Sequence, residues 1–81
     1  MKLNIKIASL IKKIRLEKNL SQEELANISG LDRTYISGIE RSTRNITISS
    51  IEEVINGLGI STNIFLSRLL NDEKQKTKKE L

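Results

Sequence analysis

The sequence predicts an all-α fold made of five short helices. Apolar residues recur at intervals of three and four along most of the chain, which is the spacing of one helical face. Proline is absent, and Leu, Ile, Lys and Glu are abundant, a composition that favours helices over strands. A serine, threonine or aspartate stands in front of four of the apolar runs, where helix N-caps are expected.

The first predicted helix spans residues 7–19 and is amphipathic. Its apolar face consists of Ile7, Leu10, Ile11 and Ile14. Lysines and an arginine lie between these positions and point to the outer side. We expect the helix to stop near Asn19, because asparagine can occupy the left-handed position that follows a helix.

The second predicted helix begins at Ser21 and is about two turns long. Ser21 and Glu24 have the spacing of a capping box, in which the hydroxyl and the carboxylate each satisfy a backbone N–H. Gly30 should end this helix, since the turn that follows needs a positive φ. The residues expected to face inward are Leu25, Ala26 and Ile28.

The third predicted helix follows a turn of three to four residues and runs from its N-cap, Asp32, to Glu40. Its expected core residues, together with Leu31 of the turn, are Ile36 and Ile39. Polar side chains then occupy the opposite side of this short helix. Two short helices joined by a tight turn that contains glycine predict a helix-turn-helix, whose second helix lies in the major groove of DNA.

A fourth and a fifth helix complete the predicted domain. Thr47 is the expected N-cap of the fourth, and Ser61 or Thr62 that of the fifth. The apolar positions of the fourth helix are Ile48, Ile51, Val54, Ile55 and Leu58. Residues 1–71 are predicted to form one DNA-binding and dimerisation domain, and residues 72–81 a charged, flexible tail.

The fifth helix carries more apolar residues than one stripe can bury inside a single chain. A surplus of this kind marks an interface. The residues predicted to form a dimer interface are Ile64, Phe65, Leu66 and Leu69. The alternative is a lid over the first and fourth helices within one chain. A two-fold dimer would place two recognition helices about 34 Å apart, which matches successive major grooves.

The composition argues against several classes of protein. The chain has no histidine and no cysteine, so the usual acid–base, nucleophilic and metal-ligand groups are missing. We therefore expect no enzyme, no metal and no cofactor. The sequence shows neither a signal peptide nor an apolar run near 18 residues, which predicts a cytoplasmic protein without a membrane partner. A net charge of +4 favours a polyanionic partner, although the tail supplies part of it.

From about residue 7 to residue 70 the chain resembles the five-helix, phage-repressor-like DNA-binding domain of XRE/Cro type. Within that span, LDRTYISGIERSTRNITISSIEEVINGL resembles the controller proteins of type II restriction-modification systems. The resemblance implies a homodimer on a pseudo-palindromic operator upstream of its own gene and the endonuclease gene. It also implies activation at low concentration and repression when a second dimer binds alongside. RNA polymerase is a candidate further partner, and the sequence does not decide whether the protein contacts it directly.

Four residues are predicted to read bases: Arg33, Thr34, Ser37 and Arg44. Arg33 lies at the start of the third helix, and its guanidinium fits O6 and N7 of guanine. Thr34 could touch a thymine methyl group, and Ser37 a base edge or a phosphate. The alternative is an exposed arginine paired with a carboxylate, next to two neutral surface hydroxyls.

Four further residues are predicted to contact the sugar–phosphate backbone: Gln22, Tyr35, Arg41 and Asn45. Gln22 opens the second helix, whose free N–H groups can bind a phosphate. The resemblance suggests a phosphate contact for Tyr35, with packing in the core as the alternative. Arg41 and Asn45 belong to a donor-rich loop, which could also be a solvated connection only.

Glu40 would repel phosphate, and the resemblance gives it a structural role instead. In related repressors an arginine of the first helix pairs with a glutamate at this place, which implies an ion pair between Arg15 and Glu40. Two other functions stay open. A phage-type repressor or antitoxin shares the scaffold, and a protein-interaction module could have lost DNA binding altogether.

Overall fold

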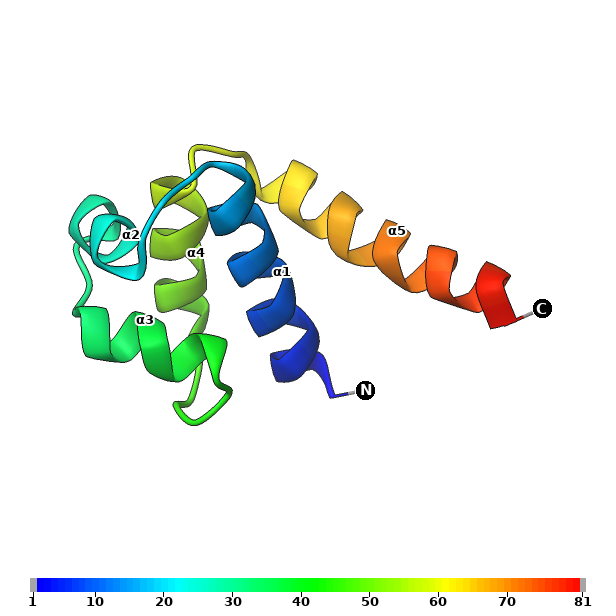
Figure 1. The fold of residues 1–81 in the computed structure, drawn as a ribbon, viewed down its shortest axis with the longest axis horizontal. Helices are drawn as coiled ribbons and strands as arrows, with labels where there is room; N and C mark the ends of the chain where they lie inside the picture. The colour runs from blue at the N-terminus through cyan, green and yellow to red at the C-terminus, as the bar shows by residue number, and fades with distance from the viewer. Residues whose placement is uncertain (1, 81) are drawn as a thin grey trace.

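The chain forms five helices in the computed structural model, which describes the backbone of residues 2–80 and the side chains of residues 2–71. They are α1 (Leu3–Glu17), α2 (Gln22–Ser29), α3 (Arg33–Glu40), α4 (Ile48–Gly57) and α5 (Thr62–Glu80). No strand occurs between residues 2 and 80. The predicted all-α fold of five helices is therefore confirmed. In Figure 1, α2 and α3 lie on one side of α4 and α1, and α5 extends away on the other side.

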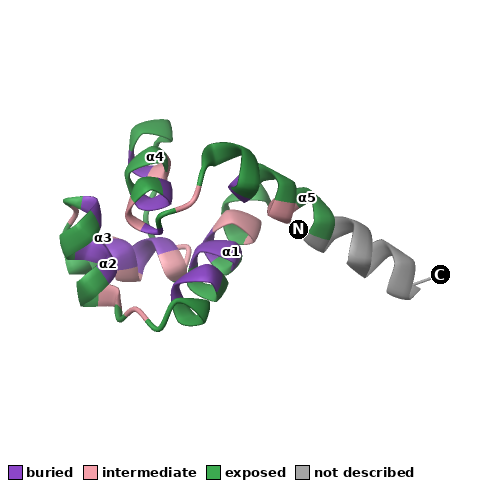
Figure 2. Ribbon diagram, turned by 90° about the horizontal axis from the view of Figure 1, so that it is seen from above, coloured by how far each residue is buried: buried purple, intermediate pink, exposed green. Residues whose placement is uncertain are grey.

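The core lies where α1, α2, α3 and α4 meet, and the start of α5 closes it. Figure 2 shows the buried positions on the inward sides of these helices. Burying each large aliphatic side chain contributes about 1.5–3 kcal/mol. The buried apolar cluster consists of Leu10, Ile11, Ile14, Leu25, Ala26, Ile36, Ile39, Val54, Ile55, Leu58 and Phe65.

Three helices end with the same turn. In each turn one residue adopts a left-handed conformation, and its N–H donates to the C=O three residues earlier. The next N–H donates to the C=O five residues earlier, and these N···O distances lie between 2.9 and 3.4 Å. This is the Schellman motif, which satisfies carbonyls that a helix end leaves free. The left-handed residues are Asn19 (φ 58°), Gly30 (φ 71°) and Ser42 (φ 61°).

The predicted capping box at the start of α2 is present. Glu24 N–H donates to Ser21 Oγ at 3.0 Å, and Ser21 N–H donates to Glu24 Oε1 at 2.8 Å. For α5 the structure decides between the two candidate caps, since Ile64 N–H donates to Ser61 Oγ at 3.1 Å. Polar residues at these two starts therefore satisfy backbone donors, as their sequence position predicts.

The caps of α3 and α4 differ from expectation in detail. Thr47 caps α4 as predicted, but Ser50 completes a capping box, with Oγ accepting from Thr47 N–H at 3.0 Å. A serine replaces the usual glutamate or glutamine, so the pattern did not stand out in the sequence. Asp32 occupies the N-cap position of α3, yet its side chain makes no capping hydrogen bond.

Two helices are longer than predicted. α1 begins at Leu3 rather than Ile7, and α5 continues to Glu80 rather than ending near residue 70. The extension at the start of α1 does not add to the core cluster, since Leu3 and Ile5 are exposed. The side chains of the predicted flexible tail, residues 72–81, lie outside the described residues, so its flexibility stays a prediction.

Two core predictions are wrong. Ile28 is 58% exposed, because α2 turns its Leu25, Ala26 and Ser29 side inward. Ser29 fits there because its small side chain packs against Gly57, where an added Cβ would overlap Ser29 Oγ. Ile48 is 79% exposed although it continues the inward stripe of α4, and it lines the apolar groove between α1, α4 and α5 instead of the core.

Candidate nucleic-acid interface

The candidate interface is the outer side of α3 with the turn before it and the loop after it. Ile36 and Ile39 fix α3 against the core through its inner side. Arg33 and Thr34 are exposed in the first turn, and Ser37 is half-buried one turn later. A helix anchored by two isoleucines thus presents polar donors outward, as the sequence predicts for a recognition helix.

Glu40 joins the end of α3 to two other helices. Arg15 donates to its two carboxylate oxygens, from Nε at 2.7 Å and from Nη2 at 3.0 Å, so the implied ion pair is present. Both side chains are almost fully buried. The hydrogen bond to Glu40 raises the pKa of Arg15 above its ordinary value, although burial opposes this. Because Arg15 neutralises it, the carboxylate of Glu40 is compatible with a phosphate chain nearby.

Gln22 belongs to the same cluster. Its Nε2 donates to Glu40 Oε1 at 3.1 Å, which holds the side chain between the start of α2 and the end of α3. A side-chain amide carries two hydrogens, so the same nitrogen can also donate to a phosphate. The predicted backbone contact of Gln22 is thus compatible with this geometry and stays a prediction.

Tyr35 connects α3 to the loop and to α4. Its hydroxyl donates to the Asn45 carbonyl at 2.9 Å and lies 3.0 Å from Ser50 Oγ. The ring is half-buried and packs against the core cluster, as the alternative in the sequence analysis proposed. A tyrosine hydroxyl has one hydrogen to donate. A phosphate contact by Tyr35 therefore requires release of the Asn45 carbonyl.

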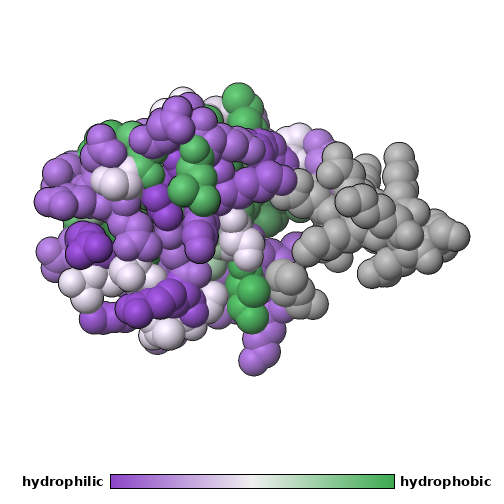
Figure 3. Space-filling view, in the orientation of Figure 1, coloured by the Kyte–Doolittle hydropathy of each residue, from purple (hydrophilic) through white to green (hydrophobic). Residues whose placement is uncertain are grey.

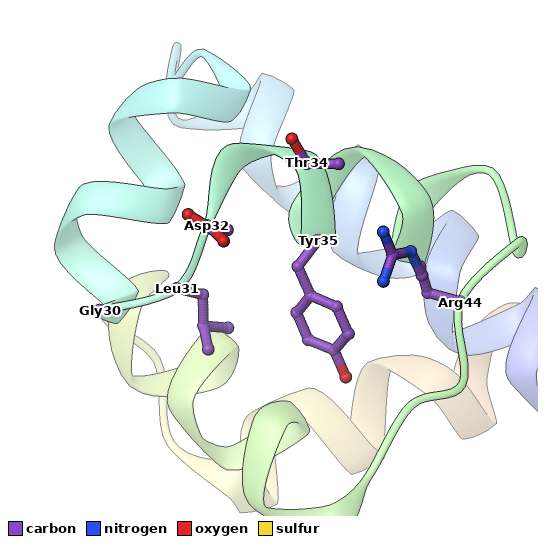
Figure 4. Close-up of a pocket in the computed structure, with 6 residues that line it drawn as sticks. All are labelled: Gly30, Leu31, Asp32, Thr34, Tyr35 and Arg44. Carbon is purple, nitrogen blue, oxygen red and sulfur yellow. The ribbon is translucent and has the colours of Figure 1, made fainter.

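A broad open recess of about 760 Å³ lies beside α3. It combines residues of the turn, of α3 and of the loop, as Figure 4 shows. Two predicted base-reading residues, Thr34 and Arg44, line it together, and the side chain of Arg44 extends from the loop toward Tyr35. The complete lining is Gly30, Leu31, Asp32, Thr34, Tyr35 and Arg44.

The remaining predicted contacts lie outside this recess. Arg33 and Ser37 belong to α3 but do not line it, and Arg41 and Asn45 are exposed in the loop. Asp32 was expected only as a cap, yet it lines the recess, where a carboxylate can accept from the amino group of cytosine. The face seen in Figure 3 is mostly hydrophilic with scattered apolar residues.

Sequence reasoning missed the residues that hold the loop in place. Ser50 Oγ lies within hydrogen-bond distance of the Tyr35 hydroxyl, at 3.0 Å, and Thr43 N–H donates to the Gly38 carbonyl at 2.9 Å. Ser42 takes the left-handed position that ends α3. Serine and threonine are common in any polar loop, so their identity gave no signal. Only the capping role of Thr47 pointed toward Ser50.

The four residues predicted to form the dimer interface lie in different surroundings. Leu66 and Leu69 line an apolar groove of about 350 Å³ between α1, α4 and α5, together with Ile48, whereas exposed Ile64 is not part of its lining. Phe65 is 1% exposed in the single chain. Phe65 nevertheless lines the same groove, so it packs in the core of the single chain, and its part in a dimer interface stays a prediction. The full lining is Ile7, Ile48, Ile51, Glu52, Ile55, Thr62, Phe65, Leu66 and Leu69.

Among the side chains of residues 2–71, no three histidine, cysteine, aspartate or glutamate residues lie close enough to hold a metal ion. Over the same part of the chain, no helix is both long and apolar enough to cross a membrane.

The sequence and the fold are similar to those of known proteins. A family model described as "Helix-turn-helix" matches residues 11–65. The control protein C.BamHI of Bacillus amyloliquefaciens is 51% identical over 51 residues, which cover 62% of this chain and 63% of that protein. The control protein C.SmaI of Serratia marcescens is 44% identical over 62 residues, covering 76% of this chain and 74% of that protein.

Solved structures show the same relationship. The restriction-modification controller protein C.Esp1396I superposes with a TM-score of 0.85 at 52% identity, covering 88% of this chain and 91% of the other. Its tetramer in complex with its natural 35 base-pair operator gives a TM-score of 0.85 at 52% identity, over 88% of this chain and 93% of the other. The chain therefore belongs to the helix-turn-helix family and, within it, to the control proteins of restriction-modification systems.

Proposed function

We propose that the protein is a dimeric, sequence-specific DNA-binding regulator that controls transcription of its own gene and of an endonuclease gene. The observation that carries this proposal is the outer side of α3, where exposed Arg33 and Thr34 lie beside the recess that Arg44 enters. The C.Esp1396I tetramer, which shares this fold, is in complex with operator DNA. Such a regulator acts in the cytoplasm and needs neither catalysis nor a cofactor.

The donors divide into two kinds of contact. Arg33 stands in the first turn of α3, where the recognition helix of this motif reaches base edges, and we assign it to guanine. Thr34, Ser37 and Arg44 complete the base-reading set. Contacts to the sugar–phosphate backbone position the protein without reading sequence. The residues assigned to them are Gln22, Tyr35, Arg41 and Asn45.

A second copy of the chain is the proposed occupant of the apolar groove. The groove is continuous with exposed Ile48 and Leu66, and apolar surface of this kind on a small domain marks an interface. The groove lies between α1, α4 and α5, so dimerisation leaves the outer side of α3 free. Two dimers on adjacent operator sites, and contact with RNA polymerase, extend the same proposal.

The test is a titration of a labelled duplex from upstream of the protein's own gene, at several salt concentrations, against a random duplex. Wild type should prefer the upstream duplex, and Arg33→Ala should lose about 1–3 kcal/mol of that preference. Lys12→Ala is the matched control, because it removes the same charge from the exposed side of α1. It should keep the preference.

The possible results separate the candidate functions. Equal binding of the two duplexes by wild type would contradict control of its own promoter. Absence of binding to any DNA at low salt would instead favour the protein-interaction module. A preference that Arg33→Ala and Lys12→Ala reduce equally would show that Arg33 contributes charge and does not read a base.

A further inference from the structure

Gly38 lies inside α3, where glycine is unfavourable. A glycine in a helix interior costs about 0.5–1 kcal/mol relative to alanine. Gly38 is buried, and it is not among the glycines with positive φ. The backbone conformation at this position therefore does not require glycine, and the reason must lie in packing.

The side chain of Arg44 explains the glycine. A Cβ added at residue 38 would overlap Arg44 Cγ, and it would lie 3.2 Å from Arg44 Cβ and 3.4 Å from Arg44 Cδ. The aliphatic part of Arg44 thus crosses α3 directly over the Gly38 backbone. Any larger residue at position 38 would occupy the space of that chain.

Arg44 cannot easily withdraw, because the atoms in contact are those nearest its own backbone. That backbone is held on both sides. Thr43 donates to the Gly38 carbonyl through its N–H at 2.9 Å and through Oγ1 at 3.3 Å. On the other side, in the chain without DNA, the Tyr35 hydroxyl donates to the Asn45 carbonyl at 2.9 Å. A side chain at position 38 would therefore force Arg44 into another rotamer.

We infer that Gly38 is a positioning residue for DNA recognition, which seats the side chain of Arg44 so that its guanidinium enters the recess beside Thr34 and Tyr35. Its carbonyl fixes the loop, and its missing side chain fixes the direction of Arg44. This inference rests on the proposed function and adds a residue that itself needs no contact with DNA.

The experiment is a double-mutant cycle with Gly38→Ala, Arg44→Ala and the double variant, measured as binding to the preferred duplex and to a random duplex. Arg44→Ala should weaken preferred binding about 10- to 100-fold. Gly38→Ala should weaken it to a similar extent, and the double variant should bind no worse than Arg44→Ala. This non-additivity is the signature of a residue that acts through another.

Gly57→Ala is the matched control, since it is the same substitution in another helix. There the added Cβ would overlap Ser29 Oγ in the packing between α2 and α4. We expect this variant to unfold at lower temperature and to keep wild-type DNA affinity where it is folded. Thermal unfolding of all four variants identifies the conditions for that comparison.

A second measurement needs no DNA. In the free wild-type protein, the Gly38 Hα protons should show nuclear Overhauser effects to the Hγ protons of Arg44, and Gly38→Ala should change the Arg44 side-chain shifts. Wild-type affinity for Gly38→Ala, or an equal further loss in the Arg44→Ala background, would overturn the inference while the proposed function stands. Wild type that shows these effects but prefers no duplex would instead overturn the proposed function, and with it the role of Gly38 in recognition.

Discussion

Arg15 and Glu40 stand 25 residues apart in the chain and form a charged pair in the interior. The pair receives further support, because Arg15 Nη1 also donates to the Leu20 carbonyl at 2.7 Å and Gln22 donates to Glu40. Glu40 thereby ties the end of α3 to α1 and to the start of α2. A recognition helix of only eight residues gains its orientation from this contact as well as from its two isoleucines.

Glu40→Ala should lower the free energy of unfolding by about 3 kcal/mol, because it leaves a buried guanidinium without its counter-charge. Glu17→Ala is the control, since it also removes a bidentate partner of an arginine, Arg68, but at the surface. Its effect should be much smaller. Urea unfolding followed by circular dichroism measures both, and equal losses would contradict the structural role of the buried pair.

The backbone conformation or capping bond of a single residue was predictable from the sequence where it depends only on that residue and its near neighbours in the chain. Gly30 and Asn19 take the left-handed conformations expected of them, and Ser21 makes its capping bond. The contacts of Tyr35 and Arg44 were not predictable to the same degree. They depend on how the loop after α3 folds back, and no local pattern specifies that path.

At the scale of the helix, the first turn of α2 stabilises this short helix through its capping box. The Glu24 carboxylate accepts a hydrogen bond from the backbone N–H of Ser21. This bond is the larger cause, and a hydrogen bond with the Ser21 side chain the smaller one, of a Glu24 pKa below the ordinary 4.5. The free N–H groups at a helix start also favour a negative charge there. The ionised form of Glu24 is thus more favourable in the folded protein than in the unfolded chain.

The sign of the pH effect follows from that difference. A lowered pKa contributes stability that is present above the ordinary value and is lost as the pH falls through the folded value. We expect Glu24→Gln to make the unfolding free energy less dependent on pH on the acid side of 4.5. Urea unfolding at a series of acid pH values measures the slope. Glu23→Gln is the control, because Glu23 lies in the same turn but outside the capping box.

The spacing of apolar residues predicted where the helices lie along the chain. It predicted only in part which face of each helix is buried. The bounds of α3 match the prediction at both ends. The face of α2 was wrong at Ile28, because small Ser29 packs against Gly57 and turns the helix. The spacing of apolar residues shows which side of a helix is hydrophobic. It does not show where the backbones of two helices pack closely, as α2 and α4 do at Ser29 and Gly57.

For the molecule as a whole, the apolar groove and the outer side of α3 are lined by different elements. α1, α4 and α5 line the groove, and α3 with its adjoining turn and loop lines the recess. This separation allows two copies to associate while each keeps its recognition helix available. The surplus of apolar residues on α5 predicted a dimer interface at this helix, whereas the position of Ile48 in the same groove follows only from the packing of α4 against α5.

Ile48→Glu should therefore dissociate the dimer without unfolding the chain, because a side chain that is 79% exposed contributes little to the core. Sedimentation velocity over a range of concentrations should show monomers, and affinity for a palindromic duplex should fall with dimerisation. Ile28→Glu is the control, since it places the same charge on exposed apolar surface of α2 away from the groove. A dimer that survives Ile48→Glu unchanged would place the interface elsewhere.

The repeated turn after α1, α2 and α3 has a consequence for how the chain reaches this structure. Each of these helices closes its own end with residues no more than five positions apart, before any partner helix is needed. Chains dominated by such near-neighbour contacts fold within microseconds to milliseconds. A newly made copy should thus be folded almost as soon as it leaves the ribosome. The time at which it begins to act is then set by its synthesis and by its pairing with a second copy, and not by its folding.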